Sequence, residues 1–176
     1  MAFYKAEKIV KQIEPYLNKH YKILDIGSGL CTVCEILRIK GYQTTPLDVQ
    51  DLSFVDGIKP ILYDGDKIPF NENEFDISLI STVLHHISHP KKILREAKRV
   101  SKKIIVVEDI YYNVLHRYLT YFFDSLSNWE FIGHPHKNKN DKGWKQTFKN
   151  LGLKLIEAKY ERIFLIFELA SYHLEK

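Results

Sequence analysis

Short apolar runs alternate with helix-like segments over the first 110 residues of this chain, and this alternation limits the folds open to it. The segments at 32–40 and 88–100 carry their apolar side chains at helical spacing. Apolar strands that alternate with helices are typical of a parallel sheet covered on both sides. We therefore expect an α/β fold with a doubly wound sheet, formed by a single domain over residues 1–176. The strands are expected at 22–26, 42–49, 60–63, 75–80 and 104–107, after an amphipathic helix over 3–19 that Pro15 kinks or ends.

The last third of the chain has a different pattern. An aromatic-rich helix is expected first, followed by a polar segment and a short helix. Two further strands follow, and Glu161-Arg162 is expected to join them as a hairpin turn. The ranges are 112–126 for the aromatic helix, 127–142 for the polar segment, 144–151 for the short helix, and 153–160 and 163–170 for the strands.

A glycine-containing loop, Asp25-Ile-Gly-Ser-Gly29, follows the first expected strand. Its glycines permit a tight turn and let a ligand lie against backbone N–H groups. Asp48 comes 21 residues after Gly27, at the end of the second strand, where a carboxylate can accept hydrogen bonds from ribose hydroxyls. The two signals together predict a nucleotide site at the carboxyl ends of the strands.

The loop differs from a dinucleotide-binding loop, which has a third glycine where this chain has Thr32. An acidic residue two positions before the first glycine, as in Asp25, resembles the loop of the class I S-adenosylmethionine (SAM)-dependent methyltransferases. The stretch "ILYDGDKIPFNENEFDISLISTVLHHISHPKKILREAKRV" is similar to the small-molecule branch that includes the ubiquinone-biosynthesis C-methyltransferases. The resemblance covers residues 20–110. Two departures are Cys31, where the family has a third loop glycine, and Ser101-Lys-Lys103, expected as an external turn in place of Pro-Gly-Gly.

The resemblance implies a Rossmann-like mixed sheet of seven strands in the order 3-2-1-4-5-7-6, with the strand at 163–170 antiparallel to the rest. It also implies SAM as the cofactor. Asp64 would accept a hydrogen bond from the adenine amino group, and the N–H of Gly65 would lie near the ring. The expected cofactor residues are Asp25, Gly27, Ser28, Gly29, Asp48, Val49, Asp64, Gly65 and Ser81.

Cys31-Thr-Val-Cys34 has the spacing of a redox pair or of half a metal site. A redox pair would leave the glycine loop and Asp48 unexplained, and a zinc site would need two more ligands in a chain with no other cysteine. We therefore expect Cys31 to fill a small-residue position and Cys34 to pack on the sheet, with no metal bound.

Candidate catalytic residues lie in three segments. His85, in a His-His-Ile-Ser-His run without evident metal partners, either lines the cleft or belongs to a turn in which Ser88 caps the next helix. His134 and His136 either supply a general base or lie in a solvated loop. Glu108, with its neighbour Asp109, is expected to face the same cleft, where it either orients the substrate or makes structural hydrogen bonds. The aromatic helix either lines an apolar substrate pocket or packs in the core.

Methyl transfer from a sulfonium requires alignment of donor and acceptor more than a protein nucleophile. The expected function is therefore SAM-dependent methyl transfer to a small molecule. The alternatives are an RNA or protein methyltransferase, which the basic residues of segment 137–145 allow, and a non-catalytic SAM-binding module. The net charge of +4 does not by itself imply nucleic acid.

The N-terminal residues lack the apolar stretch of a signal peptide, and the longest apolar run is too short to cross a membrane. We therefore expect a cytoplasmic protein without a membrane partner. The methyl acceptor and the oligomeric state stay open.

Overall fold

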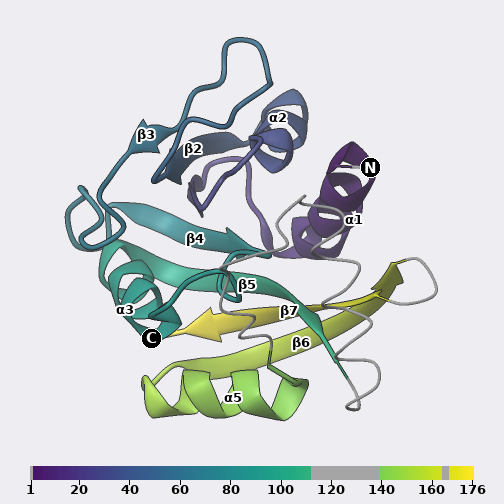
Figure 1. Cartoon of the computed structure of the whole chain (residues 1–176), viewed down its shortest axis with the longest axis vertical. Coiled ribbons are helices and arrows are strands. Elements are labelled where there is room, and N and C mark those ends of the chain that lie inside the picture. Colours follow the sequence, from purple (N-terminus) through teal and green to yellow (C-terminus); the bar gives the residue numbers. More distant parts are fainter. Residues whose placement is uncertain (1, 112–138, 164–166) are drawn as a thin grey trace.

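The computed structural model describes residues 2–111, 139–163 and 167–176. Its helices and strands follow one another around a central sheet (Figure 1). The helices are α1 (Ala2–Ile13), α2 (Thr32–Ile39), α3 (Pro90–Val100) and α5 (Asp141–Asn150), with a 3-10 turn at Glu14–Tyr16. The strands are β1 (Lys22–Ile26), β2 (Gln43–Asp48), β3 (Ile61–Leu62), β4 (Phe75–Ser81), β5 (Ser101–Ile110), β6 (Lys154–Ile163) and β7 (Phe167–Glu175).

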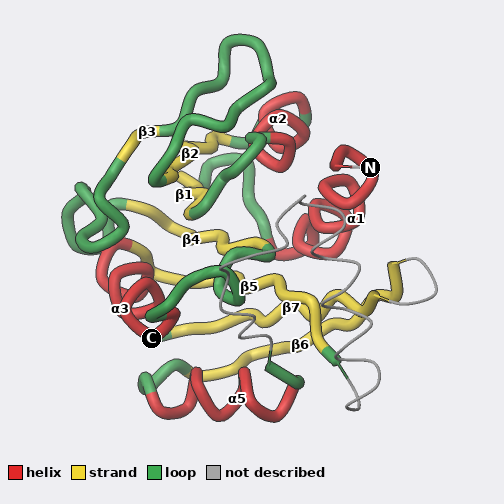
Figure 2. Tube along the Cα trace, in the orientation of Figure 1, coloured by secondary structure: helices red, strands yellow, loops and turns green. Residues whose placement is uncertain are grey.

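Within the described residues the strands form one sheet of seven, in the order β3-β2-β1-β4-β5-β7-β6. Pairing is parallel from β3 through β5, and β7 is antiparallel to both β5 and β6. The order implied by the family resemblance is thus confirmed. The loop between β2 and β3 is long and stands out in the tube view (Figure 2).

The two faces of the sheet bury different helices, as β5 illustrates. Ile104 and Val106 pack in a core cluster with apolar residues of α3 and α5, whereas Ile105 and Val107 pack in a second cluster with α1 and α2. Successive residues of a strand point to opposite faces, so a strand covered on both sides needs apolar residues at every position. This explains the unbroken apolar run that identified the strand.

Three expected boundaries were wrong, each for a local reason. The first helix ends at Ile13 rather than residue 19, because Pro15 has no N–H to continue it and lies in the 3-10 turn. Ser101 pairs with Phe75 and begins β5, so Ser101-Lys-Lys103 is strand and not an external turn. The helix α3 begins at Pro90 rather than at residue 88, because His89 is its N-cap and Pro90 occupies the first turn, where a missing N–H costs nothing.

The final strand pair also differs from its expected limits. Glu161 and Arg162 lie inside β6, paired with Leu169 and Glu168, and do not form the turn. Ile163, expected to begin the last strand, is buried at the end of β6 and pairs with Phe167. Ile163 and Phe167, expected in a single strand, therefore belong to two neighbouring strands.

None of the described helices combines the length and apolar character that a membrane crossing requires.

Candidate functional site

The glycine loop folds over the carboxyl end of β2. The N–H groups of Gly27 and Ser28 both donate to the carbonyl oxygen of Leu47, at 2.8 and 3.2 Å. Gly27 has φ of +73° and Gly29 of +49°, in the left-handed region where a side chain is disfavoured. A Cβ at Gly29 would have no atom of the described residues within 4 Å, so the described structure leaves the loop backbone open on this side. An open stretch of backbone is what a bound ligand requires there.

The carboxylate of Asp48 holds the loop from the end of β2. Its Oδ2 accepts a hydrogen bond from the N–H of Gly29 at 2.7 Å, and its Oδ1 accepts from the N–H of Val49 at 2.7 Å. The N–H of Gln50 also donates to Oδ1, at 3.4 Å. A carboxylate has about four acceptor sites, so Oδ2 retains capacity for a ligand hydroxyl. Val49, the next residue, is 53% exposed and offers an apolar surface beside that carboxylate. The expected ribose-binding position of Asp48 is therefore sterically and chemically consistent.

Asp25 lies beneath the loop and is almost completely buried, at 1% exposed. Its Oδ2 accepts a hydrogen bond from the thiol of Cys34 at 3.2 Å, whereas its Oδ1 has no hydrogen-bond partner among the described residues. Burial raises the pKa of Asp25 to about 6, and the nearby charge of Asp48 adds to this effect. A buried carboxylate short of partners would be stabilised by a cationic ligand close to the loop.

Asp64 and Gly65 lie beside Val49. A Cβ on Gly65, which has φ of +77°, would come within 3.2 Å of Val49 Cγ1. The N–H groups of Asp66 and Lys67 donate to Asp64 Oδ1 at 2.8 and 3.2 Å. Asp64 Oδ2 makes no hydrogen bond within the described part of the chain, so it is available to a ligand amino group.

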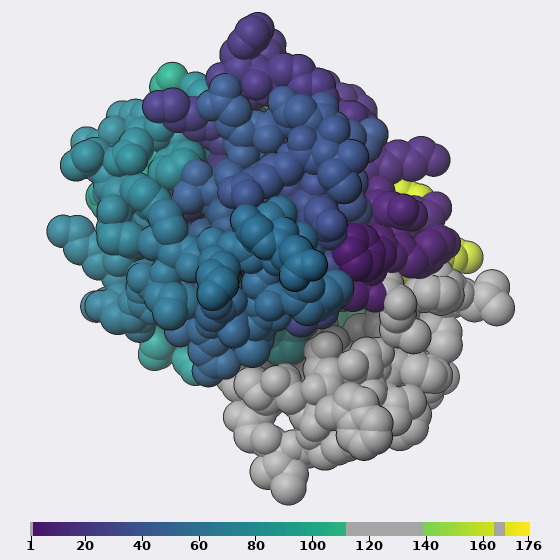
Figure 3. Space-filling view, turned by 90° about the horizontal axis from the view of Figure 1, so that it is seen from above, coloured from purple at the N-terminus to yellow at the C-terminus, as the bar shows by residue number. Residues whose placement is uncertain are grey.

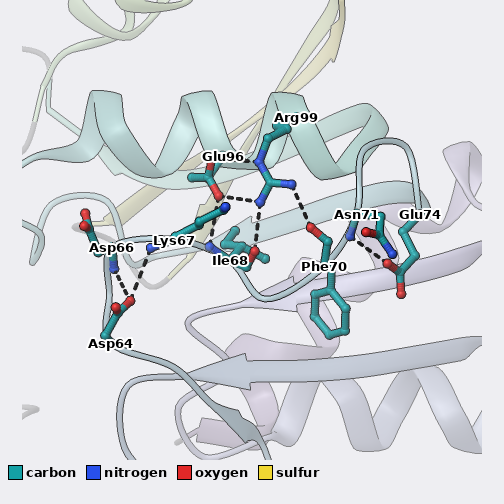
Figure 4. A network of polar contacts seen from close by, with 9 residues as sticks. All are labelled: Asp64, Asp66, Lys67, Ile68, Phe70, Asn71, Glu74, Glu96 and Arg99. Atoms are coloured by element: carbon teal, nitrogen blue, oxygen red, sulfur yellow. Dashed lines mark hydrogen bonds and ion pairs between the residues drawn. The ribbon is translucent and has the colours of Figure 1, made fainter.

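The segment that follows Asp64 is fixed to α3 by hydrogen bonds to the Glu96–Arg99 ion pair of that helix (Figure 4). Arg99 donates to the carbonyl oxygens of Ile68 and Phe70 at 2.8 and 2.7 Å. Glu96 pairs with Arg99 at 2.6 Å and accepts from the N–H of Ile68 at 2.9 Å. Because this network anchors the chain just past Gly65, the expected adenine-contacting residues are attached to a rigid element.

The turn after β4 lies against the glycine loop. A Cβ on Gly27 would come 2.6 Å from Cγ2 of Val83, so loop and turn are in close contact. Thr82, directly after Ser81 at the end of β4, has φ of +53°, an outlier for a β-branched residue. Backbone strain of this kind persists where surrounding contacts enforce it, often at functional sites.

Glu108 of β5 holds the residues that follow Thr82. Its Oε1 accepts from the N–H groups of Val83 and Leu84 at 3.0 and 2.7 Å. Its Oε2 lies 2.7 Å from Nδ1 of His85, and both side chains are buried, at 0% exposed for Glu108 and 2% for His85. The carboxylate therefore fixes three consecutive residues of the turn.

Asp109 does not share this position, which corrects the expectation that it faces the same cleft as Glu108. Because neighbouring strand residues alternate in direction, Asp109 points to the α1 face. There its Oδ2 pairs with Nζ of Lys5 at 2.8 Å. A further contact holds the N-terminal helix α1 where it adjoins the segment after β2 (Figure 3). There the rings of Phe3 and Phe54 meet edge to face, with their centroids 5.7 Å apart.

Cys31 and Cys34 are both free thiols and both buried. Cys31 is the N-cap of α2 and has φ of 60°, the region that favours glycine, which is a physical reason for a glycine at this loop position. Burial, together with the charge of Asp25, raises the pKa of the Cys34 thiol, so it remains a protonated donor. Among the described residues no three His, Cys, Asp or Glu side chains gather into a metal site.

The structure thus brings the expected cofactor residues together at one edge of the sheet. His134, His136 and the aromatic helix lie outside the described residues. Sequence reasoning did not identify Thr82, Val83 or Lys5 as parts of this edge. The position of Val83 just before Leu-His-His was a usable signal, but no sequence pattern reveals backbone strain at Thr82.

Comparison with known proteins adds independent information. A family model described as a methyltransferase domain matches residues 24–104. Over 80 residues the chain is 38% identical to the uncharacterized protein MJ1123 of Methanocaldococcus jannaschii, covering 46% of this chain and 39% of that protein. It is 30% identical over 102 residues to the demethylmenaquinone methyltransferase of Renibacterium salmoninarum, covering 49% and 40% of the two chains. The matched region therefore spans less than half the length of these relatives.

A likeness of fold covers more of the chain than the family model does. A SAM-dependent methyltransferase structure from Archaeoglobus fulgidus superposes with a TM-score of 0.72 at 15% identity, covering 99% of this chain and 94% of the other.

Proposed function

We propose that this chain, which belongs to the class I SAM-dependent methyltransferases, binds SAM at the edge described above and transfers its methyl group to a small molecule. The observation that carries the proposal is the position of Asp48. Its carboxylate spans the open glycine loop and the end of β2, at the switch point of a sheet in the methyltransferase order.

The residues at this edge fit SAM in shape and charge. Asp48 would accept from the ribose hydroxyls, and Asp64 with Gly65 would meet the adenine beside the apolar side chain of Val49. The loop from Gly27 to Gly29 would lie against the methionine end. SAM carries an ammonium at its methionine end, and this positive charge is complementary to the carboxyl group of Asp25 beneath the loop.

When SAM is bound, its sulfonium supplies an activated methyl group. The protein then has to hold the acceptor in line and exclude water. The strand ends on the β2 side of β1 would hold the adenosine. The acceptor would therefore bind on the other side, at the ends of β4 and β5. We propose that Ser81, Thr82 and the following turn form its wall there.

A small-molecule acceptor is favoured over RNA by two lysines of the basic segment 137–145. Lys139 donates to the hydroxyl of Thr147 at 2.5 Å, and Lys145 pairs with Asp141 at 2.8 Å. Lysines engaged within the chain are poorly available to a phosphate backbone. The name of the Renibacterium relative adds support for a small, quinone-like acceptor, as does the resemblance to quinone-biosynthesis enzymes.

The test is transfer of isotope-labelled methyl from SAM, with fractionated small-molecule extracts, RNA and protein as parallel acceptors. We expect label in a small-molecule fraction, and SAM or S-adenosylhomocysteine retained through purification. Label in RNA or protein alone would mean that the chain is an RNA or protein methyltransferase. Binding of SAM without transfer to any fraction would favour the non-catalytic module.

A further inference from the structure

The inference concerns the buried pair formed by Glu108 and His85, and it rests on the proposed function. Glu108 is a carboxylate without exposed surface, and burying such a group is costly unless its oxygens are satisfied. Two backbone N–H groups, of Val83 and Leu84, donate to its Oε1. These donors stabilise the ionised form, which is an acceptor only.

An ionised carboxylate next to a histidine selects the tautomer of the ring. Nδ1 of His85 lies 2.7 Å from Oε2 of Glu108, and toward an ionised carboxylate it is the ring nitrogen placed to carry the hydrogen and donate it. The lone pair of the neutral imidazole is then on Nε2. Glu108 thus fixes His85 as a ring whose basic atom is Nε2.

The position of the pair relates it to methyl transfer. His85 belongs to the turn that begins with the strained Thr82, and Val83 in that turn packs directly against Gly27 of the cofactor loop. The turn follows β4 and Glu108 lies near the end of β5, the two strands whose carboxyl ends are left for the acceptor. If Glu108 only held the turn in place, the two backbone hydrogen bonds to Oε1 would be enough. The third hydrogen bond, between Oε2 and His85, sets the tautomer of an ionisable ring.

We propose that His85 is the general base of the reaction, that Glu108 is its positioning residue, and that the acceptor is a phenol or enol hydroxyl. The acceptor O–H bond breaks and its proton goes to Nε2 of His85. The electron pair left on oxygen forms the new bond to the methyl carbon, and the carbon–sulfur bond breaks with its pair staying on sulfur. An imidazole suits hydroxyls of phenol-like acidity because such an acceptor is mostly protonated near neutral pH.

The first test is independent of activity. In protein labelled with 15N-histidine, the ring nitrogens of His85 should show the tautomer with hydrogen on Nδ1. In Glu108→Gln the side-chain amide can turn its NH₂ toward Nδ1, so the other tautomer, with hydrogen on Nε2, should replace it. A resonance pattern with Nε2 protonated in the unchanged protein would overturn the proposal.

The second test uses the rate of methyl transfer to a series of substituted phenols of graded acidity. The matched variant is His85→Asn, whose amide can keep the hydrogen bond to Glu108 but has no basic nitrogen. We expect His85→Asn and Glu108→Gln to lower kcat at least 100-fold for weakly acidic phenols while SAM affinity stays within threefold. The loss should shrink for phenols that are already ionised.

The outcomes separate this inference from the function on which it rests. Unchanged phenol methylation in both variants would sink the base assignment and leave the methyltransferase function standing. Methylation of amines but of no phenol would overturn the acceptor class. Failure of the unchanged protein to bind SAM would refute the proposed function itself, and the tautomer measurement would still decide the role of Glu108.

Discussion

Gly27 and Val83 are packed so closely that a single methyl group on Gly27 would lie 2.6 Å from Cγ2 of the valine. Real Cβ atoms do not approach another carbon to this distance. The contact joins the loop after β1 to the turn after β4, and it therefore sets the spacing between the expected cofactor site and the side of the sheet left for the acceptor.

The first prediction is that Gly27→Ala destabilises the protein more than Gly41→Ala does. Gly41 is the matched control, because its φ of +84° is also in the left-handed region but nothing lies within 4 Å of a Cβ there. Left-handed strain alone costs about 1–2 kcal/mol, and overpacking at Gly27 should add about 1–3 kcal/mol. Chemical denaturation measures both free energies of unfolding.

A second substitution checks the cause. When Val83→Ala is combined with Gly27→Ala, most of the stability lost through overpacking should return. The stability lost through the left-handed backbone conformation at residue 27 should not. Equal destabilisation by Gly27→Ala and Gly41→Ala would mean that the contact with Val83 relaxes freely.

The next prediction concerns ribose binding by Asp48. Replacement by Ala should weaken SAM binding by about 1.5–3 kcal/mol, the range for hydrogen bonds to a charged group. Because Asp48 also accepts from the N–H of Gly29, Asp48→Asn is the better-matched variant, since it keeps one carbonyl oxygen for the loop. Calorimetry with both variants should rank the affinities as Asp, then Asn, then Ala. Unchanged affinity in a folded Ala variant would exclude the ribose role.

The parallel strands and the cofactor loop could be predicted because they depend on short-range signals, whereas the order of the strands in the sheet was implied only by the family resemblance. Gly27 and Asp48 are identified by their spacing along the chain, and apolar runs identify the parallel strands. The limits of β6 and β7 could not be predicted, because an apolar run does not show where a chain turns back. Ile163 is buried at the end of one strand, although it resembles the beginning of the next.

The roles of Glu108 and Asp109 were harder to predict than their location. Two adjacent carboxylates at the end of an apolar run suggest a strand that has already ended, whereas β5 continues to Ile110. Strand alternation then separates them, one toward His85 and the other toward Lys5. The buried carboxylate of Glu108 is stabilised by backbone N–H groups of a turn that is distant in the sequence. No sequence pattern shows that these groups will lie beside it.

The cysteines give a third prediction. We expect Cys31 and Cys34 to stay reduced and free of metal, and the double Cys→Ser variant to keep SAM affinity within about tenfold, or roughly 1.4 kcal/mol. A serine hydroxyl at position 34 can replace the thiol that donates to Asp25. Elemental analysis and calorimetry test this. Stoichiometric zinc, or loss of SAM binding on mild reduction, would contradict it.

The last prediction concerns the charge of Asp25, which should affect stability and SAM binding in opposite directions as the pH changes. Its pKa is raised from 3.8 to about 6 in the folded protein, so the fold favours the protonated carboxyl. The stability that this preference contributes is fully present at pH values below the pKa of Asp25 in the unfolded chain. It is lost as the pH rises through about 6. Without ligand, Asp25→Asn should therefore be more stable than the unchanged protein at pH 8, by up to about 3 kcal/mol. That advantage should shrink by about 1–1.5 kcal/mol on going to pH 5.

SAM binding should respond in the opposite sense, because a cationic ligand near the loop favours the ionised carboxylate. In the unchanged protein, SAM affinity should rise about tenfold between pH 5 and pH 7, with release of a proton on binding. The Asn variant should bind SAM more weakly at pH 7 and lose this pH dependence, although it is the more stable protein. Calorimetry in two buffers of different ionisation enthalpy measures the released proton. Equal pH dependence in the two proteins would mean that Asp25 stays protonated in the complex and only supports the fold of the loop.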